Sequence, residues 1–147
     1  MHEGTVLGFD FGTRRIGVAV GEAMLKSARA LTTIVTEANA ARFEAIGKLI
    51  TEWQPRCLVV GLPLALDGSE HEMSARCRRF AKQLHGRFGL PVELADERLT
   101  SVTAEATLRS RGRDPRQHKA AIDAEAAAII LQSYFDRTPH GETASSN

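Results

Sequence analysis

Three acidic residues, Asp10, Glu97 and Asp123, have the type and placement that metal-dependent chemistry needs. Asp10 ends the apolar run Val6-Leu7-Gly8-Phe9, where a short strand is expected. Because an unpaired buried carboxylate is costly, Asp10 needs a hydrogen-bond donor, a cation or water. Flanking glycines favour close approach by a phosphate or another backbone. The alternative is a turn aspartate that accepts backbone N–H bonds.

Asp123 lies on the apolar stripe of an expected helix. Its offsets of three, four, seven and eleven residues lead to Ala126, Ala127, Ile130 and Tyr134. This spacing places all five side chains on one helical face, which should pack on the core. The alternative is an aspartate near the helix N-terminus, stabilised only by the helix dipole.

The pair Asp96-Glu97 follows the last expected strand. Consecutive strand residues point to opposite faces, so only one of the two can share a crevice with Asp10. The sequence leaves open which one does. The other carboxylate would cap the next turn or pair with Arg98.

Three converging carboxylates predict a site for a hard divalent cation, Mg²⁺ or Mn²⁺, with one or two ions bound. Two such ions about 3.5–4 Å apart can activate water and stabilise the leaving oxygen of a phosphodiester. The acidic set, Asp10, Asp123 and one of Asp96 and Glu97, therefore predicts metal-dependent phosphodiester hydrolysis.

Basic residues near these acids are candidates for contacts with the phosphates of a nucleic acid, although a solvated polar connector is an alternative for the later part of the set. One tryptophan and one tyrosine leave little for base stacking, so recognition of backbone or shape is expected. The candidates are Arg14, Arg15, Arg98, Arg109, Arg111, Arg113, Arg116 and Lys119.

The composition predicts one domain. The chain has 147 residues, is 43% hydrophobic and carries a net charge of +1, so any basic surface must be local. We expect a domain over residues 1–136 and a disordered tail over 137–147. The lack of a signal-peptide pattern or a long apolar run predicts a cytoplasmic protein. Cys57 and Cys77 are expected to be reduced core residues.

The order of expected elements is β-β-β-α-β-α-β-α-α, with the last helix over about Lys119–Phe135 and a shorter helix after Thr100. Thr36 or Asn39 should cap the first helix, and Gly89 should end the second. This order predicts an α/β fold with a mixed five-stranded sheet and helices on both faces. It resembles the order of elements in the ribonuclease H-like fold, which implies that the first strand lies centrally beside the fourth. Ligands of such sheets bind at the carboxyl ends of the strands, where the acids would converge.

Four sequence blocks together resemble the YqgF family of pre-16S rRNA nucleases, also described as RuvX-type Holliday junction resolvases. They are Gly8-Phe9-Asp10-Phe11-Gly12-Thr13-Arg14-Arg15-Ile16-Gly17-Val18-Ala19, Val59-Val60-Gly61-Leu62-Pro63, Asp96-Glu97-Arg98-Leu99-Thr100-Ser101 and the block from Asp123 to Gln132. The resemblance implies a ribonuclease H-like fold, a divalent-metal nuclease and a cytoplasmic role in ribosomal RNA maturation. Asp10, Glu97 and Asp123 match the family's acidic positions.

The fourth expected strand ends in Gly61-Leu62-Pro63 without an acid, unlike other resolvases of this fold. Glu97 would therefore supply the second carboxylate, and the number of metal ions stays open. The main interpretation is an endonuclease acting on structured RNA, as a monomer or homodimer. The alternatives are a Holliday junction resolvase, for which a homodimer would suit the two-fold junction, an ATPase-like domain, and a non-catalytic nucleic-acid-binding module.

Overall fold

The computed structural model of the chain describes residues 4–64, 67–96 and 115–137, with side chains from residue 122 onward in the last helix. The strands are β1 (Thr5–Phe11), β2 (Arg15–Glu22), β3 (Ser27–Val35), β4 (Cys57–Leu62) and β5 (Val92–Asp96). The helices are α1 (Asn39–Trp53), α2 (Glu72–Phe88) and α4 (Pro115–Arg137).

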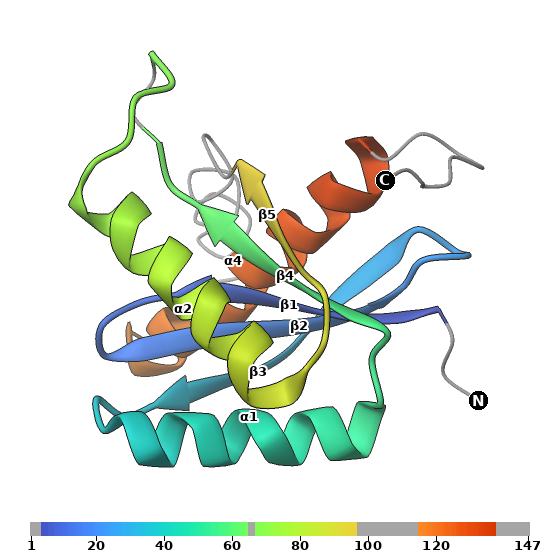
Figure 1. Cartoon of the computed structure of the whole chain (residues 1–147), viewed down its shortest axis with the longest axis horizontal. Helices are drawn as coiled ribbons and strands as arrows, with labels where there is room; N and C mark the ends of the chain where they lie inside the picture. Colours follow the sequence, from blue (N-terminus) through green and yellow to red (C-terminus); the bar gives the residue numbers. More distant parts are fainter. Residues whose placement is uncertain (1–3, 65–66, 97–114, 138–147) are drawn as a thin grey trace.

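The five strands form one sheet in the order β3-β2-β1-β4-β5 (Figure 1). β1, β2 and β3 form an antiparallel meander, as expected for strands joined by short connections. β4 runs parallel to β1, and β5 runs parallel to β4. The predicted fold class, with β1 central and β4 beside it, is confirmed.

Side chains alternate between two cores, one on each face of the sheet. On one face Leu7 and Phe9 of β1 pack with Phe43 of α1 and Phe80 of α2. On the other face Val6 and its neighbours pack against α4. The short apolar strand β4 is buried along its whole length, which is typical of a strand covered on both faces.

Helix α4 lies directly on the backbone of the meander because Gly17 has no side chain. A Cβ atom at Gly17 would stand 1.8 Å from the backbone oxygen of Asp123. No side chain fits in that space. The glycine therefore sets how close the helix carrying Asp123 comes to β2.

The helix boundaries differ from the sequence prediction in two places. α4 is already helical at Pro115, four residues before Lys119, and a proline is tolerated in the first turn of a helix. It also extends to Arg137, into the segment expected to be a disordered tail. Ala38, and neither Thr36 nor Asn39, occupies the N-cap position of α1, without a side-chain cap.

Other local predictions are confirmed. Gly89 ends α2 with a φ of 70°, and its N–H donates to the carbonyl of His85. Cys57 and Cys77 are buried thiols. None of the helices within the described ranges has an apolar stretch long enough to cross a membrane. The predicted helix after Thr100 and the segment 138–147 lie outside the described residues.

Candidate active site

Asp10 projects from β1 onto the face covered by α4. It is directly opposite Gly17 in the antiparallel register of β1 and β2, so the two residues point to the same side of the sheet. Gly17 contacts Asp123 across that face. Val6, four residues before Asp10, packs in the same core. Asp10 is half-buried and has an interaction partner of its own.

The helical repeat brings Asp123 to the level of Asp10. Farther back on β1, a Cβ at Gly8 would lie 3.4 Å from the backbone oxygen of Ala127. Two strand residues span roughly 6.8 Å and one helical turn about 5.4 Å, so the step from Gly8 to Asp10 matches the step from Ala127 back to Asp123. The structure thus places two of the three predicted acids at one end of the α4 face.

Arg15 contacts Asp123, a partner that the sequence did not predict. Arg15 Nε donates to Asp123 Oδ2 at 2.6 Å, and the two side chains are 33% and 23% exposed. Arg15 and Gly17 share a face of β2, so the same strand contacts Asp123 through a side chain and through its backbone. Among the described residues, Asp123 Oδ1 accepts no hydrogen bond.

The structure places Asp96 away from Asp10. Val92 and Leu94 pack against the core under α2, and Ala95 packs against the α4 side. Asp96 therefore belongs to the α2 face by strand alternation. Glu97, the other member of the pair, lies outside the described residues.

The described donor set fits a hard divalent cation in its chemistry, because Asp10 and Asp123 offer carboxylate oxygens at one edge of a water-accessible face. In residues 4–64, 67–96 and 115–137, no three histidine, cysteine or acidic side chains form a metal-sized group. Asp10 and Asp123 are thus the two described carboxylates available at this edge.

The predicted phosphate-binding residues are only partly described. Arg14 is exposed and pairs with Glu37 at 3.3 Å, a surface contact that contributes little to stability. Arg116 and Lys119 lie in the first two turns of α4, where the structure describes the backbone and not the side chains. The remaining four, Arg98, Arg109, Arg111 and Arg113, lie outside the described residues.

Arg42 of α1 holds the turn that follows Asp10, and sequence reasoning missed it. Its side chain is 4% exposed and donates to the backbone oxygens of Gly12 at 2.7 Å, of Thr13 and of Thr36 at 2.7 Å. Burial lowers the pKa of the Arg42 guanidinium, and Glu37 opposes this shift. Its spacing of four residues from the buried Ile46 was the available signal.

The sheet order and the pair of acids at its edge define a ribonuclease H-like domain, and solved structures support this class. The structure superposes on Thermus thermophilus RuvC bound to a Holliday junction with a TM-score of 0.53 and 19% identity, covering 89% of this chain and 93% of that one. The fowlpox virus resolvase in complex with Holliday junction DNA superposes with a TM-score of 0.56 and 8% identity, covering 90% of this chain and 97% of that one. Identities this low show the fold alone.

The chain belongs to the family described as RuvX, Holliday junction resolvase, whose model matches residues 4–137. Two relatives named "Putative pre-16S rRNA nuclease" are closely similar. The Dechloromonas aromatica protein is 58% identical over 93% of both chains, and the Methylobacillus flagellatus protein is 57% identical over 90% of this chain and 91% of its own. The predicted membership in this nuclease family is confirmed.

Proposed function

We propose that this protein is a metal-dependent endonuclease that hydrolyses phosphodiester bonds in structured RNA and processes the 5′ end of pre-16S rRNA in the cytoplasm. The observation that carries the proposal is the placement of Asp10 and Asp123 on one face of the sheet, brought together at Gly17. The names of the relatives supply the RNA substrate.

Asp10, Asp123 and Glu97 would hold Mg²⁺ or Mn²⁺, as one or two ions. Alternation along β5 assigns Glu93 and Ala95 to the α4 face and Asp96 to the α2 face, which favours Glu97 as the third carboxylate. The bound metal supplies an activated water and stabilises negative charge on the cleaved phosphate.

The chain's own residues position this chemistry. Arg15 fixes one oxygen of Asp123 and leaves the other for the cation. Arg42 fixes the backbone of the Gly12-Thr13 turn, directly after Asp10. The basic residues Arg14, Arg98, Arg109, Arg111, Arg113, Arg116 and Lys119 would hold backbone phosphates around the cleaved bond, a role that requires charge and no base reading.

Cleavage of a labelled pre-16S rRNA fragment, with and without Mg²⁺, tests the proposal. Wild-type protein should cut the fragment only with metal. Asp10→Asn should cut at least about 100-fold more slowly, because losing even an outer partner of a ligand typically costs 10–100-fold. Equal cutting by Asp10→Asn and wild type would contradict the mechanism.

A four-way DNA junction is the second candidate substrate, favoured by the family description. The same acids would act on it, and symmetric cutting would require a homodimer. A junction included in the same assay separates the substrates. Light scattering measures whether the protein is a dimer. If the protein is a dimer and cuts the junction faster than the RNA, the substrate is a DNA junction and the proposed RNA substrate is wrong.

A further inference from the structure

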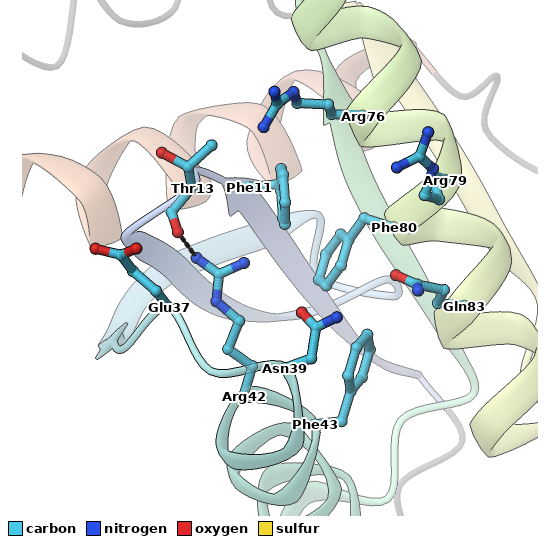
Figure 2. A pocket seen from close by; sticks show the side chains of 10 residues that line it. All are labelled: Phe11, Thr13, Glu37, Asn39, Arg42, Phe43, Arg76, Arg79, Phe80 and Gln83. Atoms are coloured by element: carbon cyan, nitrogen blue, oxygen red, sulfur yellow. Dashed lines mark hydrogen bonds between the residues drawn. The ribbon is translucent and has the colours of Figure 1, made fainter.

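A basic cleft lies between α1 and α2, on the face of the sheet opposite the acids. It has a volume of about 300 Å³. Figure 2 shows Arg76 and Arg79 projecting from α2 on one side, and Arg42 from α1 with Thr13 of the β1–β2 turn on the other. Arg14 and Arg15, the two predicted phosphate-binding residues whose side chains the structure describes, do not line this cleft.

The charges around the cleft favour an anion. Arg79 is exposed and, among the described residues, forms no ion pair. Arg42 donates only to neutral backbone oxygens. Within the part of the chain that the structure describes, Glu37 is the one acid in the lining and is paired with Arg14, while Arg76 is paired with an exposed glutamate at 2.8 Å. The described lining thus carries three arginines and one glutamate, and Arg79 is the arginine without an ion pair.

Aromatic rings form the floor of the cleft. Phe11 and Phe80 lie 4.7 Å apart between ring centroids, and Phe80 is 6.0 Å from Phe43. Phe11 is half-buried, so part of its ring faces the cleft, and Arg42 lies 5.3 Å from the centre of this ring. A partly exposed ring near guanidinium groups can accept a base or sugar next to a phosphate.

The cleft and the acidic site meet at one point of β1. Asp10 and Phe11 are consecutive, and their side chains point to opposite faces of the sheet at its carboxyl edge. The Gly12-Thr13 turn is the rim between them. A strand bound at Asp10 that crosses this rim would enter the cleft within one or two nucleotides.

We infer that the cleft lined by Phe11, Arg76 and Arg79 binds one unpaired nucleotide of the nucleic-acid strand that is cut at Asp10. The inference rests on the proposed function for the identity of the ligand. Pockets that enclose small molecules range over about 300–1000 Å³, and a cavity at the lower limit has room for one nucleotide and excludes a duplex. The site therefore selects substrates with an unpaired end or bulge beside the cleaved bond.

Binding without metal tests the cleft separately from catalysis. The probe is a fluorescein-labelled single-stranded RNA of ten nucleotides, measured by anisotropy in EDTA against full-length protein. Arg79→Ala should weaken binding about tenfold and reduce the dependence of log K on log salt by about 0.7, the value for one phosphate on a single strand. Arg79 is exposed, so this variant keeps the fold.

Lys82→Ala is the matched control, because Lys82 is an exposed cation on the same helix that lines a different cavity. It should change the affinity less than twofold. Two variants at the cleft wall extend the test, Gln83→Lys with tighter binding and Gln83→Glu with weaker binding.

Equal losses in Arg79→Ala and Lys82→Ala would overturn the inference, since they would indicate diffuse attraction. Unchanged affinity in Arg79→Ala would overturn it as well, as would tight binding of ATP with no binding of the RNA. The proposed function fails by a different result, namely metal-dependent cleavage that persists in Asp10→Asn. If RNA binds at the cleft and is never cut, the inference about the cleft holds and the proposed nuclease function is wrong.

Discussion

Arg15 and Asp123 are 108 positions apart in the chain, and their side chains meet at 2.6 Å beside Gly17. The contact joins the second strand to the last helix at the level of Asp10. It holds the Asp123 carboxylate in one orientation, while the close approach at Gly17 fixes the helix backbone beneath it. The acidic site is therefore positioned by an ion pair and a glycine as well as by the fold.

Arg15→Ala should reduce metal-dependent cleavage about tenfold or more, because a misplaced catalytic group is costly even when it moves little. The free energy of unfolding should fall by only about 1 kcal/mol or less, since both partners are partly exposed. Single-turnover rates and urea unfolding measure the two effects. Lys48→Ala on the exposed side of α1 serves as the control. Wild-type cleavage by Arg15→Ala would show that Arg15 does not position Asp123.

Gly17→Ala should destabilise the protein by about 3 kcal/mol, the upper end for overpacking, because the new Cβ meets backbone. Gly86→Ala on α2 is the matched control. A Cβ at Gly86 has no atom within 4 Å, and alanine favours a helix by up to about 1 kcal/mol. Urea unfolding should therefore shift in opposite directions for the two variants. A shift in the same direction would argue against the close approach of α4.

Arg42→Ala should cost about 2–3 kcal/mol, because it leaves the backbone oxygens of Gly12, Thr13 and Thr36 without their donor. Arg42→Lys should recover part of this loss, since one ammonium group cannot reach all three oxygens in the fork geometry of arginine. Thermal unfolding measures both. Equal melting temperatures for wild type and Arg42→Ala would rule out the anchoring role.

Cys57 should resist alkylation in the native protein. Burial raises the pKa of its thiol, with Glu93 adding to the shift and Arg56 opposing it, so little thiolate forms at neutral pH. An unfolded thiol ionises near pH 8.5. The folded state keeps its proton to higher pH, so this group's contribution to stability is complete below about pH 8.5 and is lost as the pH rises through the folded pKa. Iodoacetamide labelling, followed by mass spectrometry, should be fast only in denaturant. Fast labelling of native protein at pH 8 would contradict the burial.

The strands and the alternation of faces could be predicted from the sequence, because short apolar runs and a helical stripe determine them locally. The place of β4 beside β1 was predicted from the resemblance to the ribonuclease H-like fold. The same stripe correctly predicted that Ala126, Ala127 and Ile130 would be buried and that Asp123 would face the sheet. Strand alternation predicted that only one of Asp96 and Glu97 faces the same side of the sheet as Asp10. The structure then assigned Asp96 to the face away from Asp10.

The features of the site that the sequence did not predict depend on contacts between distant segments of the chain. No local pattern links Arg15 to Asp123, so the sequence predicted a phosphate contact for Arg15 and did not indicate its carboxylate partner. Arg42 resembles a surface arginine until the turn at Gly12 is placed beside it. The cleft residues Arg76 and Arg79 lie off the apolar stripe of α2, where cations usually face solvent.

The central claim is that Asp10 and Asp123 hold a divalent cation, and anomalous diffraction from crystals containing Mn²⁺ tests it most directly. The expected result is an anomalous peak in contact with the Asp10 carboxylate on the α4 face, which disappears in Asp10→Asn. A map with no peak at Asp10, or the same peak in wild type and Asp10→Asn, would contradict the account.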